Sequence, residues 1–200
     1  MTRKIFVIRH GETLFNSEQK LQGHCNSPLT NKGESQALSV GTTLREYLTD
    51  RSYHVYCSSL GRAVQTAQII CDAIGYDQST LTQDDRLKEF SLGEWEQRTI
   101  PSLIEENPAL LERRDWYIQA PGCETYESVK GRLLSWISEL PEEQDIVVIS
   151  HGLTGIVLRG ILLDLSYQEV WAQDLPQDAF FLIQNGGITR IDCMATEAVA

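Results

Sequence analysis

Three short runs rich in apolar residues form the clearest hydrophobic pattern in the chain. They cover residues 4–8 (Lys4-Ile5-Phe6-Val7-Ile8), 54–57 and 145–149. A nearly continuous apolar run of this length indicates a strand that is buried on both faces, as in a parallel sheet covered by helices. Residues 179–183 and 188–191, which flank Asn185-Gly186-Gly187, predict a β-hairpin.

Helical spacing of apolar positions fills the segments between these runs. After Thr30, a favourable N-cap, apolar or small residues recur at helical spacing: Ala37, Leu38, Gly41, Leu44 and Leu48. Ser58-Ser59 is expected to cap a helix over about 61–73 that Gly75 closes, and helices are expected over 124–140 and 153–163. This alternation predicts an α/β fold, a three-layer α/β/α sandwich around a mostly parallel sheet.

One stretch, residues 92–123, has only weak periodicity and contains Pro101, Pro108 and Pro121. We expect it to leave the sheet as a small cap insertion. No internal repeat and no Gly, Ser or Pro-rich linker divides the chain, so we expect a single domain over residues 1–200.

The composition narrows the classes of partner. Asp and Glu number 28 against 17 Lys and Arg, for a net charge of −11, and such a field repels nucleic acid and anionic membranes. The N-terminal apolar run is too short and too polar for a signal peptide or a membrane span. Five scattered cysteines suit neither a disulfide framework nor a thiolate metal site. These features predict a cytoplasmic protein, and a homodimer stays open.

Functional side chains follow all three apolar runs. Arg9-His10-Gly11 follows the first, Arg62 lies shortly after the second, and His151-Gly152 follows the third. The carboxyl ends of parallel strands meet at one edge of a sheet, so two histidines and two arginines are expected to share one pocket. Arginine side chains and helix N-termini both bind phosphate oxygens, so phosphate is the ligand that fits.

The chemistry of such a pocket is phosphoryl transfer to a histidine. An imidazole among cations has a lowered pKa and, when neutral, offers a nucleophilic nitrogen. An acid must also protonate the departing oxygen. The residue types alone leave several carboxylates as candidates: Asp84, Asp85, Glu89, Glu94 and Glu96.

Motifs in a fixed order extend this interpretation over residues 4 to about 191. They are Arg9-His10-Gly11-Glu12-Thr13 with Asn16, Leu21-Gln22-Gly23, Pro28-Leu29-Thr30, Ser58-Ser59-Leu60-Gly61-Arg62-Ala63, Arg86-Leu87-Lys88-Glu89, Leu92-Gly93 and Ser150-His151-Gly152. With them the chain resembles the histidine phosphatase superfamily, to which the cofactor-dependent phosphoglycerate mutases belong.

The resemblance implies a role for each matching residue. His10 would be the nucleophile that becomes a phosphohistidine, Arg9, Arg62 and His151 would bind the phosphate, and Glu89 would be the proton donor. Substrate contacts are expected from Thr13, Asn16, Gln22, Gly23, Gly152 and Leu153. No metal and no cofactor is implied, and the partner would be a small phosphorylated metabolite.

Three functions remain open at this point. The favoured one is a metal-independent phosphomonoesterase of the histidine acid phosphatase type. The segment between Glu89 and His151 is short, which leaves little chain to exclude water and disfavours the alternative, a cofactor-dependent phosphoglycerate mutase. The third is a phosphate-binding module without turnover.

Two departures from the usual motifs, Gln97 and Cys123 where relatives often carry glycine, lie in the expected cap and leave the choice of substrate open. Arg113 and Arg114 are expected to belong to a solvated charged face.

Overall fold

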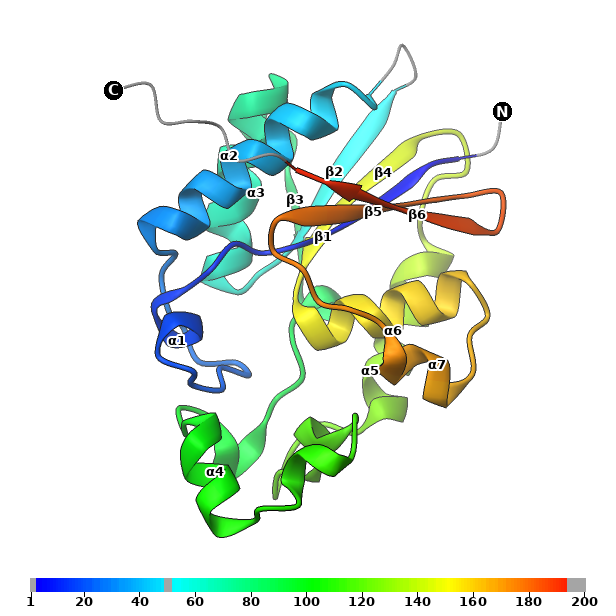
Figure 1. Cartoon of the computed structure of the whole chain (residues 1–200). Coiled ribbons are helices and arrows are strands. Elements are labelled where there is room, and N and C mark those ends of the chain that lie inside the picture. The colour runs from blue at the N-terminus through cyan, green and yellow to red at the C-terminus, as the bar shows by residue number, and fades with distance from the viewer. Residues whose placement is uncertain (1–2, 49–51, 194–200) are drawn as a thin grey trace.

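The computed structural model describes residues 3–48 and 52–193 (Figure 1). Within them, six strands form one sheet in the order β3-β2-β4-β1-β5-β6. The strands are β1 (Ile5–Arg9), β2 (Tyr53–Ser58), β3 (Thr82–Asp84), β4 (Asp145–Ser150), β5 (Ala179–Gln184) and β6 (Gly187–Asp192). β3, β2, β4 and β1 run parallel to one another, β5 is antiparallel to β1, and β6 is antiparallel to β5. The mostly parallel sheet and the hairpin are confirmed.

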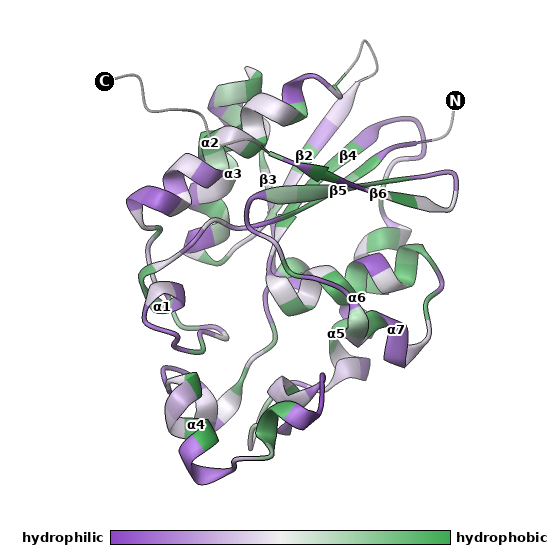
Figure 2. Cartoon of the chain, viewed as in Figure 1, coloured by the Kyte–Doolittle hydropathy of each residue, from purple (hydrophilic) through white to green (hydrophobic). Residues whose placement is uncertain are grey.

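Helices cover both faces of this sheet, which confirms the three-layer sandwich (Figure 1). Alternate residues of β1 point to opposite sides: Phe6 and Ile8 pack with α2 (Asn31–Arg45) and α3 (Gly61–Ile74). Ile5 and Val7 lie in a second core with α5 (Tyr126–Ser138), α6 (Gly152–Leu162) and α7 (Tyr167–Ala172). Figure 2 shows largely hydrophobic turns in α6, which is almost wholly buried. It also shows hydrophilic residues on α2.

The helix ends follow the predicted signals in part. The Thr30 side chain caps α2 by accepting a hydrogen bond from the Gly33 N–H at 3.0 Å, and Gly75 closes α3 at a φ of 72°. The predicted cap at Ser58-Ser59 is wrong, because Leu60 is the N-cap of α3 and makes no side-chain capping bond. The Ser58 hydroxyl instead lies against His151.

The segment 92–123 contains no strand and lies below the sheet in Figure 1. It consists of α4 (Ile100–Glu106) and the short 3₁₀ turns Gly93–Trp95, Leu110–Glu112 and Trp116–Gln119. Gln97 adopts a φ of 67°, in the region that favours glycine. That conformation explains why a glycine suits this position.

The remaining short elements connect the layers. They are α1 (Leu14–Ser17) and the 3₁₀ turns Gln78–Thr80 and Asp85–Leu87. All five cysteines are free thiols. In the described part of the chain, no helix has the length and apolar character needed to cross a membrane.

Candidate active site

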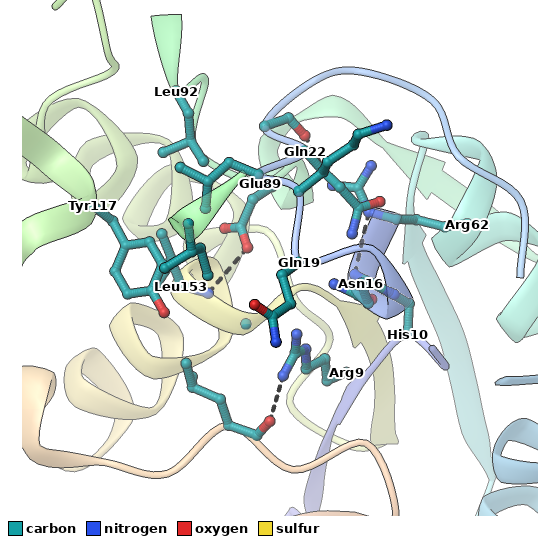
Figure 3. A pocket seen from close by; sticks show the side chains of 16 residues that line it. Arg9, His10, Asn16, Gln19, Gln22, Arg62, Glu89, Leu92, Tyr117 and Leu153 are labelled. Atoms are coloured by element: carbon teal, nitrogen blue, oxygen red, sulfur yellow. Dashed lines mark hydrogen bonds between the residues drawn. The ribbon is translucent and has the colours of Figure 1, made fainter. Parts of the chain in front are cut away.

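The carboxyl ends of β1, β2 and β4 meet beside a cavity of about 200 Å³ (Figure 3). β4 pairs with both β1 and β2, so the loops that follow the three strands converge. Nine residues expected at the site line this cavity: Arg9, His10, Asn16, Gln22, Gly23, Arg62, Glu89, Gly152 and Leu153. The topology therefore brings together the side chains that follow the three apolar runs.

The His10 ring is held in one defined tautomer. Its Nδ1 lies 2.8 Å from the Gly11 carbonyl oxygen, which can only accept, so Nδ1 carries the proton. Its Nε2 receives a hydrogen bond from Arg62 Nε at 3.2 Å, so this nitrogen has the lone pair. Burial, together with Arg62 and Arg9, lowers the pKa of His10 well below 6.5. The ring is thus a neutral imidazole that offers Nε2.

Carbonyl oxygens hold both arginines, of which Arg62 is buried and Arg9 is half-buried. Arg62 is 1% exposed, and its two terminal nitrogens donate to the Gly23 and Cys25 carbonyls at 2.8 and 3.0 Å. Burial lowers the pKa of Arg62 to about 10, and that of Arg9 is also lowered by burial. Arg9 donates to the Leu175 carbonyl (Figure 3). Among the described residues, neither guanidinium has a carboxylate partner, so both keep positive charge for an anion.

His151 lies against His10 and is not among the residues that line the main cavity. The two ring centroids are 5.2 Å apart, and His151 is 1% exposed. Its Nε2 is 2.7 Å from the Ser58 hydroxyl, which also accepts from the Leu60 N–H. If Ser58 donates to Nε2, the proton of His151 resides on Nδ1, a buried atom without a partner in the described chain. Burial and Arg62 lower the pKa of His151 well below 6.5.

The Glu89 carboxylate is hydrogen-bonded to backbone N–H groups at the N-terminus of α6. Oε1 accepts from the N–H groups of Thr154 (2.9 Å) and Phe90 (3.1 Å) and from the Thr154 hydroxyl. Within the described residues, Oε2 accepts only from the Leu153 N–H, at 3.1 Å (Figure 3). Oε2 therefore retains a free lone pair for a proton, whereas three donors already surround Oε1.

Asn16 is oriented by a residue that the sequence did not suggest. The Gln177 amide donates to the His10 carbonyl at 3.1 Å and to Asn16 Oδ1 at 3.2 Å. Thr13, predicted as a substrate contact, is fully buried and outside the cavity lining, because its hydroxyl caps α1 by accepting from the Asn16 N–H. Thr13 thus positions Asn16 from behind.

Several lining residues were not predicted as site residues, because Leu21 and Leu92 belong to motifs but were given no role and no motif includes the others. They come from residues 19–21, from the segment 92–123 and from the chain before β5: Gln19, Lys20, Leu21, Leu92, Ile100, Tyr117 and Leu175. Arg113 pairs with Asp115 at 2.9 Å and Arg114 donates to the Ala172 carbonyl, so both lie outside the lining as expected.

The site contains unpaired buried polar atoms. Five buried side-chain nitrogen or oxygen atoms in the described residues lack a partner, and three of them belong to Arg9 (Nε), Gln22 (Oε1) and His151 (Nδ1). Unpaired buried polar atoms are rare and cost about 1–3 kcal/mol each, so a cluster of them indicates a ligand site. Over residues 3–48 and 52–193, no three His, Cys, Asp or Glu side chains gather as a metal would require.

Sequence comparisons show which proteins this chain resembles. A profile of the histidine phosphatase superfamily (branch 1) matches residues 5–194. A curated relative from Salmonella paratyphi C, named probable phosphoglycerate mutase GpmB, is 35% identical over 98% of this chain and 88% of its own length.

Solved structures have the same fold. The alpha-ribazole phosphatase from Shigella flexneri is 25% identical, with a TM-score of 0.74 over 98% of both chains. A mycobacterial glucosyl-3-phosphoglycerate phosphatase is 24% identical, with a TM-score of 0.76 over 90% of both chains.

Proposed function

The chain belongs to the histidine phosphatase superfamily (branch 1), and we propose that it is a metal-independent phosphomonoesterase that hydrolyses a small phosphorylated metabolite through a phosphohistidine at His10. The observation that carries this proposal is the state of the His10 ring. Its protonated Nδ1 is held by a carbonyl, and its Nε2 lone pair points to the cavity end where Arg62 Nε donates to it, a hydrogen bond that the bound phosphate would replace. A neutral imidazole in this position is a nucleophile beside an anion-binding group.

In the first step, His10 Nε2 attacks phosphorus and the bond to the ester oxygen breaks. Glu89 transfers a proton from Oε2 to that oxygen, so the alcohol leaves as a neutral molecule. Arg9, Arg62 and the Nδ1–H of His151 stabilise the charge on the three transferring oxygens. The charge builds up among donors that are already fixed, which limits reorganisation during the reaction.

In the second step, water replaces the alcohol. Glu89 accepts a proton from this water, which attacks the phosphorus, and the bond between phosphorus and Nε2 breaks. Inorganic phosphate forms, and His10 returns to its neutral tautomer. Asn16 and Gln22 would hold the substrate, while the segment 92–123 would act as the cap over its leaving group.

A second candidate is phosphoglycerate mutase activity, which the names of the curated relatives favour. It uses the same intermediate but returns the phosphoryl group to another hydroxyl of a bound phosphoglycerate. We prefer hydrolysis because the described cap has only one α-helix, the seven-residue α4, with which to exclude water.

The two functions are separated by incubating the purified chain with 3-phosphoglycerate and a trace of the 2,3-bisphosphate. Hydrolysis predicts phosphate release that outpaces formation of 2-phosphoglycerate. Isomer formation much faster than phosphate release would make the chain a mutase. A third outcome would favour the phosphate-binding module without turnover. In that case neither reaction occurs, no phosphate ester gives an acid-labile label on the protein, and His10→Ala behaves like the wild type.

A further inference from the structure

We propose that the substrate of this site is the phosphate monoester of an uncharged alcohol, and that monoesters with a carboxylate or a second phosphate beside the ester are disfavoured. The inference rests on the proposed function and concerns its substrate class. It follows from where the charges and the apolar side chains lie around the cavity.

The positive charge of the cavity is concentrated at one end. Arg9 and Arg62 lie beside His10, where the transferring phosphate must sit, and Arg62 is fixed to two carbonyls. Among the described residues, Glu89 is the one carboxylate in the lining, and it lies between this end and Tyr117 (Figure 3). Once Glu89 has given its proton to the ester oxygen, a carboxylate on the leaving group would lie beside another carboxylate, which is unfavourable in a partly buried site.

Lys20 is the remaining cation of the described lining, and it already has partners. Its ammonium forms an ion pair with Glu18 at 2.6 Å and lies 5.4 Å from the centre of the Phe15 ring. Both contacts hold the Lys20 ammonium at the exposed rim of the cavity. A leaving-group carboxylate would have to replace Glu18, so Lys20 provides little net attraction for it.

The wall beside Glu89 is apolar. Leu92, Tyr117 and Leu153 lie together on the side of the cavity opposite Arg62 (Figure 3). Ile100 at the start of α4 belongs to the same lining, and Leu92 is only 3% exposed. A carbon skeleton can pack against this wall, whereas a charged group there would lose water without a partner. Gln19 and Gln22 supply uncharged polar groups that suit hydroxyls.

The test compares two three-carbon monoesters that differ in one group. Glycerol 3-phosphate carries a hydroxymethyl group where 3-phosphoglycerate carries a carboxylate. The wild-type chain is expected to show a kcat/KM for glycerol 3-phosphate at least about tenfold higher, the effect of one unpaired charge. An equal or higher kcat/KM for 3-phosphoglycerate would overturn the inference.

A charge-adding variant tests the location of the wall. Ile100 is half-buried, and its backbone N–H donates to the Gln19 carbonyl, a bond that any side chain preserves. Ile100→Lys should raise the ratio of 3-phosphoglycerate to glycerol 3-phosphate turnover about threefold to fivefold. Ile100→Gln, the uncharged control of similar length, should leave that ratio unchanged. The placement of the leaving group is contradicted if this ratio rises in both variants. It is also contradicted if both variants fold and the ratio rises in neither.

Failure of this inference is distinguishable from failure of the proposed function. Hydrolysis of p-nitrophenyl phosphate with an acid-labile protein label reports the proposed chemistry without regard to the natural leaving group. If that reaction is present and the carboxylate ester is preferred, the substrate class is wrong. If that reaction is absent, the proposed function itself fails.

Discussion

Replacing Glu89 by glutamine removes the proposed acid with little change in shape. Oε1 already accepts three hydrogen bonds, so the amide oxygen of the introduced glutamine should take this position. The amide nitrogen then replaces Oε2 and faces the Leu153 N–H, its donor at 3.1 Å. Glu89→Gln therefore exchanges one accepted hydrogen bond for a contact between two donors and leaves the other three intact.

Two effects of different size follow from this geometry. The lost bond and the unpaired donors should lower the free energy of unfolding by about 1–3 kcal/mol. Loss of general acid catalysis should lower kcat for an alkyl phosphate by about 10²–10⁴-fold. An aryl phosphate such as p-nitrophenyl phosphate has a good leaving group that needs no proton, so its first step should slow by less than about tenfold.

The assay is a rapid-quench measurement of alcohol or phenol release from glycerol 3-phosphate and p-nitrophenyl phosphate. Single-turnover conditions isolate the first step, because Glu89 is also the proposed base of the second. Glu94→Gln is the matched control: it changes the same residue type at an exposed position nearby. It should leave both release rates within about twofold of the wild type.

The acid role of Glu89 is refuted if both esters lose activity equally in Glu89→Gln. Equal losses would mean that Glu89 acts through the N-terminus of α6, by holding Leu153 and Thr154, and not as an acid. Thermal unfolding of the variant checks this alternative, because a disordered helix end would lower the Tm far more than one lost hydrogen bond.

Two further predictions concern residues around the nucleophile. Because the pKa values of buried His10 and His151 lie below that of an unfolded histidine, the unfolded chain binds more protons as the pH drops below about 6.5, and stability falls. Each pKa unit by which folding lowers a histidine pKa is worth about 1.4 kcal/mol. The free energy of unfolding from denaturant titrations should therefore fall from about pH 7 to about pH 5, and it should fall less steeply in His10→Gln. The same pH dependence in both proteins would refute this linkage. Gln177→Leu should lower kcat about tenfold or more with a smaller change in KM, because Gln177 holds the His10 carbonyl and Asn16. Gln177→Glu, which can still approach but cannot donate, should not restore kcat, and full activity in either variant would remove the positioning role.

The sequence predicted the parts of the fold that bury continuous apolar surface. β1 and β4 are apolar through most of their length, and both lie in the middle of the sheet. β3 (Thr82–Asp84) was not predicted, because it is a polar edge strand that exists only through its pairing with β2. The six-residue α7 is too short for periodicity to reveal, and its capping box at Ser166 and Glu169 is its one local signal.

The site was predictable where it follows strand ends and unpredictable where it depends on distant loops. Arg9, His10, Arg62 and Gly152 lie where parallel topology requires. Gln177 contacts His10 across 167 positions of the chain, and no spacing rule anticipates such a bond. Tyr117 reaches the cavity from a region whose polar and proline-interrupted pattern predicts only an excursion from the sheet.

The most direct test of the account is the position of the phosphoryl group on the enzyme. The wild-type chain and Glu89→Gln are mixed with an aryl phosphate, quenched in alkali and analysed by mass spectrometry and ³¹P NMR. The proposed mechanism predicts one phosphorylated residue, His10, substituted at Nε2, because Nδ1 is protonated and held by the Gly11 carbonyl. A phosphoryl group at Nδ1, on His151 or on any other residue would contradict it.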